Sequence, residues 1–489
     1  MDWKEEYKRK LVSAEEAARM VKSGERVVIP IGQSADVIPR ALAARRDDLR
    51  NVEVLHGAPN VMYDWFQPGW EESFLVNLAQ YTGAIPRGMM LERRSDFTPV
   101  TFALELKDLD ERRPGMIEPD VLITVVSPPD EHGFCSFGHC MWQKKEYVKR
   151  AKKVLAEQNS YLIRTYGDNF VHVLELDCIV EADPIVPSPE EMEAVIAQAP
   201  PQNQEKLRWI VQQQTPDRIS SIKDALLFFQ PDELAVLLGL GEATEVHYAI
   251  AGYLSELIKD GDTVQIGYGT TSNSLVTAGL FDNKHDLGLH TEVCPGGLFD
   301  LVKEGVFTGK YKTLHQGKAI ATSFWPAARP LDLEYIDGNP LFELYGSNYT
   351  NNIKTIAAHD NMVAVNNAMF VDLTGQIGSE TTMGFRLQNG PGGQLDFTIG
   401  ALCSRGGRSV TVLPSRALGG AVSRIVPLME EGVMVTVPRT YADFIVTDQG
   451  IASLLGKSQR RRAEEIIAIA HPDFRAELRK EAQKLFYPE

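Results

Sequence analysis

The residues best suited to covalent chemistry lie in one loop, Leu289-His-Thr-Glu-Val-Cys-Pro-Gly-Gly297. An apolar strand is expected to end near Glu292, and a helix is expected to begin near Leu298. Ligands of open α/β sheets collect at the carboxyl ends of strands, where a carboxylate can attack an activated carbonyl group. A surface glutamate on an ordinary loop is the simpler alternative, and the motif alone does not exclude it.

Two glycine-rich loops could bind the anionic or carbonyl part of a substrate. The first, Gln265-Ile-Gly-Tyr-Gly269, ends a short strand and precedes an expected helix, whose N-terminus favours a phosphate. The second contains Gly390, Gly392 and Gly393 ahead of buriable apolar residues, and its exposed amides could hold a phosphate or a carbonyl oxygen. Turns without any ligand are the alternative for both loops.

The chain repeats itself weakly, and the repeat indicates which elements carry these loops. Four segments of the first half match four segments of the second half in the same order. The pairs are 20–32 with 257–269, 51–56 with 286–291, 120–133 with 362–375, and 176–183 with 442–449. Each match contains an apolar strand, and helices alternate with the strands. We therefore predict an α/β fold of two tandem duplicated open domains with mostly parallel sheets.

The repeat also predicts the domain boundaries. Residues 1–198 are expected to form the N-terminal α/β domain, and 245–489 the C-terminal α/β domain that carries Glu292. The segment 199–244 has no counterpart in the first half and contains two apolar helical patches. It is predicted to be a linker with a helical insertion, packed on the body of the protein or on a second subunit.

Within the repeat, Glu292 corresponds to Gly57, so the two equivalent loops should face each other across the domain pair. One loop then carries a carboxylate, whereas the other, His56-Gly-Ala-Pro59, offers small groups and backbone. That asymmetry is typical of a nucleophile opposite a backbone oxyanion site.

Composition narrows the classes of function. Hydrophobic residues make up 44% of the 489 residues and charged residues 24%, with a net charge of −16, which disfavours nucleic acid and anionic membranes as partners. Apolar runs are too short for a membrane span and the charged start of the chain does not resemble a signal peptide, so a cytoplasmic protein is expected. The five cysteines and ten histidines lack metal-site spacing, so neither disulfides nor a metal site are expected.

Taken together, the motifs resemble the acetyl-CoA hydrolase/transferase family, which includes the 4-hydroxybutyrate, butyrate and acetate CoA-transferases. The resemblance covers nearly the whole chain. It is carried by SPPDEHGFCSFG at 127–138, GYG at 267–269, LGLHTEV around Glu292, VDLTGQIGSET at 371–381, GPGGQLDF at 390–397, and VTDQGIASLLGKSQRRR from 446. It implies a homodimeric enzyme that moves CoA from an acyl-CoA to a small carboxylic acid, with coenzyme A as co-substrate and no resident cofactor.

The resemblance also implies roles for individual residues. Glu292 falls on the family's catalytic glutamate, which attacks the thioester and becomes a glutamyl-CoA thioester in a ping-pong reaction. The family's CoA-binding segments match Gln265, Ile266, Gly267, Tyr268, Gly269, Gly392 and Gly393. The oxyanion site is expected near Ala58, Asn60 and Gly393, and the carboxylate substrate near Gln33, His56, Tyr81 and Arg87.

The sequence departs from the family pattern at three places. Ser272 stands where the family usually has proline, and Pro295-Gly-Gly297 stands where it usually has an acidic residue and a glycine. The 199–244 insertion also looks unusual for the family. Two alternatives to a transferase stay open: an acyl-CoA hydrolase in which the same Glu292 admits water, and a ligand-sensing α/β protein without turnover.

Overall fold

The computed structural model describes residues 2–81, 83, 85–184, 186–214, 218–219, 222–324, 329–382 and 384–488. The first half forms a seven-stranded parallel sheet in the order β10-β7-β5-β1-β2-β3-β4. Its strands are β1 (Arg26–Ile29), β2 (Val52–His56), β3 (Phe74–Ala79), β4 (Asp96–Thr98), β5 (Val121–Val126), β7 (Lys153–Gln158) and β10 (Cys178–Glu181). The central strand β5, VLITVV, is buried along its whole length, as expected of a parallel strand covered on both faces.

The second half forms a nine-stranded sheet in the order β25-β24-β20-β15-β11-β12-β13-β14-β8. Its strands are β11 (Thr263–Ile266), β12 (Gly288–His290), β13 (Ala319–Ala321), β14 (Phe342–Leu344), β15 (Met362–Asn367), β20 (Arg408–Val412), β24 (Phe444–Thr447) and β25 (Gly450–Ser453). Only β25 runs antiparallel to its neighbour in this sheet. The edge strand β8 (Tyr166–Gly167) comes from the first half, so the two halves share one sheet edge.

Apart from the edge strands β25 and β8, the second sheet repeats the strand order of the first, which confirms the predicted duplication and the predicted α/β fold with mostly parallel sheets. The four repeated segments fall on β1 and β11, β2 and β12, β5 and β15, and β10 and β24. In each pair the two strands occupy the same position in their sheets. The boundaries at 198 and 245 stay a prediction.

Helices and short hairpins complete both halves. The helices are α1 (Trp3–Lys10), α2 (Ala14–Ala18), α3 (Val37–Ala43), α4 (Arg87–Leu91), α5 (Lys107–Asp110), α6 (Lys144–Val148), α7 (Pro189–Ile196), α8 (Pro201–Gln212), α10 (Pro231–Leu237), α11 (Glu245–Glu256), α12 (Thr270–Thr277), α13 (Leu298–Lys303), α14 (Pro330–Ile336), α15 (Ser347–Thr350), α16 (Ile353–Ala357), α17 (Gln394–Cys403), α18 (Gln459–Ala468) and α19 (Pro472–Phe486). The 3₁₀ turns are η1 (Asp64–Phe66), η2 (Val173–Glu175), η3 (Ala225–Leu227), η4 (Leu418–Gly420) and η5 (Arg439–Tyr441). The short strands are β6 (Phe134–Ser136), β9 (Phe170–His172), β16 (Phe370–Asp372), β17 (Ile377–Gly378), β18 (Thr381–Thr382), β19 (Arg386–Leu387), β21 (Arg416–Ala417), β22 (Val422–Ser423) and β23 (Ile425–Val426).

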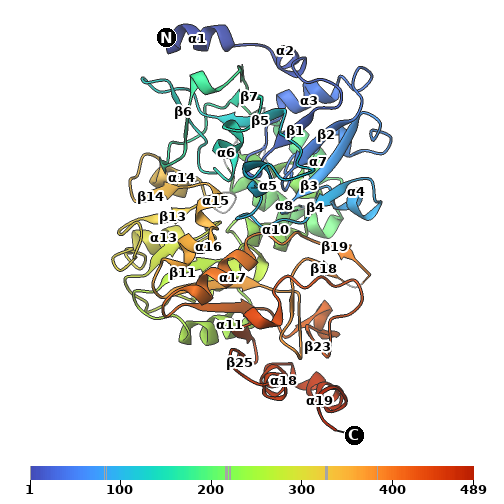
Figure 1. The fold of residues 1–489 in the computed structure, drawn as a ribbon, viewed down its shortest axis with the longest axis vertical. Helices are drawn as coiled ribbons and strands as arrows, with labels where there is room; N and C mark the ends of the chain where they lie inside the picture. The colour runs from blue at the N-terminus through green and yellow to red at the C-terminus, as the bar shows by residue number, and fades with distance from the viewer. Residues whose placement is uncertain are drawn as a thin grey trace.

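The two halves pack directly against each other. In Figure 1 the blue-to-cyan first half lies above the yellow-to-red second half, and α18 and α19 lie at the far lower end. One apolar cluster runs through the seam, from Val28 and Leu122 of the first sheet to Val264 and Val365 of the second. The carboxyl ends of strands from both sheets therefore face a common interior region.

The described residues of the segment 199–244 include α8, η3 and α10, which together with α7 form a small apolar core of their own. That core includes Met192, Leu207, Ile210, Leu226 and Leu234. In Figure 1, α8 and α10 lie at the level of the seam between the halves. The predicted insertion is thus a helical subdomain placed beside the region where the two halves meet.

Candidate active site

Glu292 lies just past the end of β12, at the carboxyl edge of the second sheet. Its main chain is fixed, because the amides of Thr322 and Ser323 both donate to the Glu292 carbonyl oxygen at 3.0 Å. Its side chain is only 6% exposed. This placement differs from the simpler alternative of a solvated loop glutamate.

Both halves of the chain contact the Glu292 carboxylate. Asn351, which follows α15, donates from Nδ2 to Oε2 at 2.7 Å. The Tyr81 hydroxyl, from the loop after β3 of the first sheet, donates to Oε1 at 3.3 Å. Since each oxygen has a donor from a different element, the carboxylate is held in one orientation at the seam.

Gly393 leaves room for this carboxylate. A Cβ at position 393 would lie 2.0 Å from Glu292 Oε2 and 2.1 Å from Asn351 Nδ2, distances that real Cβ atoms do not reach. Gly393 is also the N-cap of the ten-residue helix α17, so the positive end of that helix points toward the carboxylate. Gly392 has a positive φ of 53°, and a Cβ there would lie 2.5 Å from the Tyr81 hydroxyl.

The environment changes the acidity of Glu292. Its pKa is raised from the ordinary value to about 7, mainly by burial and in smaller part by the nearby charge of Asp396, while the hydrogen bonds from Asn351 and Tyr81 act in the opposite direction. Asp396 itself is buried, and that burial raises its pKa to about 7 as well. Glu292 is therefore an unusually basic carboxylate near neutral pH, which increases its nucleophilicity.

A cavity of about 310 Å³ lies next to Glu292, and three parts of the chain line it. The first half contributes loops after β1, β2 and β3, including Tyr81, and the second half contributes the loops after β11 and β12, including Val293. A third part of the wall comes from residues 222–238 of the helical segment, and Trp142, Gln388 and Asn389 complete the lining. The cavity is thus formed where the carboxyl edges of both sheets meet, as expected for ligand sites of α/β folds.

Among the residues predicted for the oxyanion site, Ala58 and Asn60 both line this cavity. The Ala58 amide, however, donates to the Tyr81 carbonyl oxygen at 2.9 Å, so in this conformation it is already engaged. The Asn60 side chain is 9% exposed, and its Nδ2 has no hydrogen-bond partner among the described residues. The unsatisfied donor of this loop is therefore a side-chain amide.

The predicted CoA loop divides into a buried part and a cavity-lining part. Tyr268 and Gly269 line the cavity. Gln265 and Ile266 are inside β11, 2% and 0% exposed, and the Gln265 amide pairs with Asn366. Gly267 packs on β15, where a Cβ would lie 2.8 Å from Asn366 Oδ1. The side chains of the first two residues support the loop and do not face the cavity.

Ser272, one of the departures from the family pattern, fastens this loop. Its amide donates to Asn367 Oδ1 at 2.9 Å, and its hydroxyl bonds the carbonyl of Gly267 and accepts from Asn367 Nδ2. A proline at this position would have no N–H to donate to Asn367.

Besides Tyr81, three residues are predicted to lie near the carboxylate substrate, and they lie in different places. Arg87 lines the cavity, and its Nη2 donates to the Gln388 carbonyl at 3.3 Å. Gln33 lines a smaller neighbouring cavity of about 60 Å³, which Asn60 also borders. His56 is fully buried, packs on the Tyr63 ring, and burial lowers its pKa to about 3. The prediction of a substrate contact by His56 therefore disagrees with its position, because the imidazole is a neutral core group.

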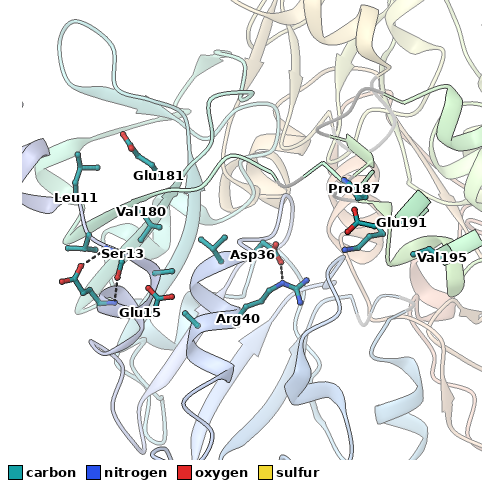
Figure 2. A pocket seen from close by; sticks show the side chains of 16 residues that line it. Leu11, Ser13, Glu15, Asp36, Arg40, Val180, Glu181, Pro187, Glu191 and Val195 are labelled. Carbon is teal, nitrogen blue, oxygen red and sulfur yellow. Dashed lines mark hydrogen bonds and ion pairs between the residues drawn. The ribbon is translucent and has the colours of Figure 1, made fainter. Parts of the chain in front are cut away.

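A larger surface groove, of about 1060 Å³, lies on the first half between α2, α3, β10 and α7 (Figure 2). Figure 2 shows Asp36 paired with Arg40 in its middle, with Ser13 and Glu15 on one side and Glu191 on the other. None of the predicted site residues lines it. Because none of the predicted site residues reaches this groove, the cavity beside Glu292 is the better candidate for chemistry.

The described residues offer no alternative metal, disulfide or membrane-spanning feature. No group of three or more His, Cys, Asp or Glu side chains there is arranged to hold a metal ion. All five cysteines are free, and Cys294 is fully buried. Within the same residues, no helix combines the length and the apolarity that a bilayer crossing requires.

Asn351 is the site residue that sequence reasoning missed. It lies in Gly346-Ser-Asn-Tyr-Thr-Asn-Asn352, where three asparagines occur within five residues and no motif distinguishes one from another. Only the position of the α15–α16 turn relative to β12 reveals its contact with Glu292.

Comparison with known proteins places the chain in a family. Residues 97–189 match the N-terminal domain and residues 333–482 the C-terminal domain of the acetyl-CoA hydrolase/transferase model. The chain is 35% identical to 4-hydroxybutyrate coenzyme A transferase of Clostridium kluyveri over 488 residues, 99% of this chain and 100% of that protein. It is 34% identical to succinyl-CoA:cyclohexane-1-carboxylate CoA transferase of Geobacter metallireducens, over 99% of this chain and 97% of that protein.

A solved structure agrees with these sequence matches. RipA from Yersinia pestis superposes with a TM-score of 0.80 at 28% identity, covering 99% of each chain. That the 199–244 segment is unusual for the family stays a prediction. The chain belongs to the acetyl-CoA hydrolase/transferase family.

Proposed function

We propose that this protein is a CoA-transferase that moves CoA from an acyl-CoA to a carboxylic acid, and that Glu292 carries the CoA as a thioester. The observation that supports this most directly is the position of Glu292, buried at the seam of the two halves and held by Asn351 and Tyr81 beside a cavity. The relatives include enzymes named for transfer of CoA to 4-hydroxybutyrate and cyclohexane-1-carboxylate. A small carboxylic acid is therefore the proposed acceptor.

The first half-reaction proceeds in two balanced steps. A carboxylate oxygen of Glu292 attacks the thioester carbonyl, the C–S bond breaks, and CoA leaves as a thiolate, which gives a mixed anhydride. The thiolate then attacks the glutamyl carbonyl of that anhydride. Its C–O bond breaks, the original acid leaves as a carboxylate, and Glu292 becomes the acyl part of a glutamyl-CoA thioester.

The second half-reaction reverses these steps with the incoming acid. Its carboxylate attacks the glutamyl thioester, the CoA thiolate leaves, and the thiolate then attacks the acyl carbonyl of the new anhydride to release acyl-CoA and free Glu292. Each tetrahedral intermediate places negative charge on a carbonyl oxygen. Two groups are proposed to stabilise this negative charge: the N-terminus of α17 at Gly393 and the side-chain amide of Asn60, whose Nδ2 has no partner among the described residues.

Loops on opposite sides of the cavity are proposed to bind different parts of the substrate. We assign the CoA arm to the Gly267–Gly269 and Gly392–Gly393 loops of the second half and the carboxylate to Arg87 of the first half. The low exposure of Glu292 limits the access of water, which otherwise hydrolyses the anhydride and the thioester. No resident cofactor takes part in these steps. A homodimer in the cytoplasm is part of the same proposal.

The test is direct detection of the covalent intermediate. The protein is mixed with acetyl-CoA, butyryl-CoA or a larger acyl-CoA, digested at mildly acidic pH, and analysed by mass spectrometry. We expect CoA, less one water, on the peptide that contains Glu292, and its conversion by hydroxylamine to a hydroxamate. A parallel assay compares acyl transfer to added acids with thioester loss in water. Equal rates of thioester loss with and without acid would indicate the hydrolase, and absence of any adduct would contradict the proposal and favour a ligand sensor.

The rate of adduct formation should depend on pH in one direction. Only the deprotonated carboxylate is nucleophilic, and burial raises the pKa of Glu292 to about 7. We expect the second-order rate constant to rise about tenfold per pH unit below pH 7 and to level off above it. Quenched-flow measurement of the glutamyl-CoA adduct by mass spectrometry between pH 5.5 and pH 8.5 checks this, and a flat profile would contradict it.

A further inference from the structure

We propose that the helical wall at 222–238 selects the acyl group by size, with Leu237 as the main determinant, and that it favours bulky apolar acyl groups over acetyl. The inference rests on the proposed CoA-transferase function, since it concerns the acyl end of that substrate. Neither the composition nor the motifs of the sequence assign this wall a role.

The wall presents apolar side chains to the cavity from one face of a helix. Leu234, Leu237 and Leu238 fall at positions i, i+3 and i+4 of α10 and its C-cap, and all three line the cavity together with Phe229. Leu234 and Leu238 also belong to the core of the helical subdomain, whereas Leu237 does not. Leu237 is therefore an apolar residue whose contacts lie largely on the cavity side.

The wall is attached to the same loops that hold the reacting groups. The Tyr268 hydroxyl, on the predicted CoA loop, donates to the Leu237 carbonyl oxygen at 3.0 Å. Gly239 touches the loop that follows Glu292, where a Cβ on Gly296 would lie 2.5 Å from the Gly239 Cα. On the other side, Asp224 accepts from the Met62 amide at 2.7 Å. These contacts fix Leu237 at a defined place relative to the nucleophile.

The size of the cavity indicates which acyl groups suit the wall. At about 30 Å³ for each atom of the size of a water molecule, 310 Å³ holds roughly ten non-hydrogen atoms. An acetyl group occupies a small part of that space and leaves Phe229 and Leu237 without contacts. Each additional methylene that becomes buried is expected to improve binding about fourfold. Branched, alicyclic or aromatic acids would reach Phe229 and Leu237 in the part of the cavity that the CoA arm leaves free.

The test is a competition among acids. Purified protein receives one acyl-CoA donor and equimolar acetate, butyrate, cyclohexanecarboxylate and benzoate, and the acyl-CoA products are separated and quantified. We expect the wild type to prefer the larger acids. Leu237→Ala should raise the ratio of cyclohexanecarboxylate to butyrate transfer at least threefold, because the smaller side chain enlarges the cavity. Leu237→Trp should lower the same ratio at least tenfold, because an indole fills the space.

Leu227→Ala is the matched control, because Leu227 is 43% exposed, lies on the same segment and does not line the cavity. Its product ratios should equal those of the wild type. Phe229→Ala provides a second variant of the wall should either Leu237 variant fail to fold, and thermal unfolding monitors all four proteins. Unchanged ratios in the folded wall variants, or a change in Leu227→Ala of the same size, would overturn the inference. A wild type that transfers CoA to no acid would instead contradict the proposed function.

Discussion

Glu292→Gln is expected to lower the rate of CoA transfer by at least about 10⁴-fold, because a neutral amide cannot form the anhydride. The substitution keeps the shape of the side chain, so Asn351 can still donate to the remaining carbonyl oxygen. Glu292→Asp should retain some activity, about a hundredfold below the wild type, since shortening by one methylene withdraws the nucleophile by roughly 1 Å. Steady-state transfer assays and adduct formation measure both effects.

Glu292→Gln should also be more stable than the wild type above neutral pH. Burial raises the pKa of Glu292 in the folded protein above its unfolded value, so ionisation opposes folding, progressively from about pH 4.5 to 7 and fully above pH 7. Replacing the carboxylate removes that cost, which amounts to at most about 3 kcal/mol at pH 8 and vanishes near pH 4.5. Denaturant unfolding gives the free energy of unfolding of both proteins. The difference between Glu292→Gln and the wild type should be small at pH 5 and large at pH 8.

Glu53→Gln serves as the control for both measurements. Glu53 lies near the start of β2, at the edge of the sheet away from the site, where it pairs with Arg26 at 2.8 Å. Its replacement should leave transfer unchanged. Transfer by Glu292→Gln within tenfold of the wild type would remove Glu292 from the mechanism.

Most of the fold could be predicted from the sequence, because its repeated strands are short, apolar and followed by glycine or polar turns. The four matched segments have local patterns strong enough to indicate paired strands, and the parallel arrangement follows from the intervening helices. The edge strand β8 could not be predicted. Tyr166–Gly167 has only two residues, and its pairing with β14 arises from a contact between segments more than 170 residues apart.

A site residue could be predicted from the sequence only where the local sequence of its own loop indicates its position. Glu292 and the glycines at 267 and 269 are of this kind, since they closely follow β12 and β11. Whether a neighbouring side chain faces the cavity depends on packing between the halves, which no local pattern contains. His56 lies next to the oxyanion loop and still points into the core, whereas Asn351 lies 59 residues from Glu292 and touches it.

The close packing around Gly393 leads to the second large effect. The N-cap of α17 lies against the carboxylate with no space for a methyl group, so any side chain must displace either Glu292 or Asn351. Displacement of Glu292 moves the nucleophile away from the thioester. Displacement of the loop moves the amides at the helix N-terminus away from the developing oxyanion. Both routes reduce catalysis without removing a reacting group.

Gly393→Ala is therefore expected to lower kcat for CoA transfer by at least about a hundredfold, because relieving a 2.0 Å contact requires a shift of roughly 1 Å. Gly252→Ala is the matched control: it lies within α11, nothing lies within 4 Å of the added Cβ, and it should raise stability by about 1 kcal/mol with unchanged transfer. Transfer kinetics, with thermal unfolding to confirm folding, test both variants. A folded Gly393→Ala enzyme with nearly normal kcat would mean that Glu292 and the start of α17 do not act together, and the oxyanion assignment would have to move to the Asn60 side of the cavity.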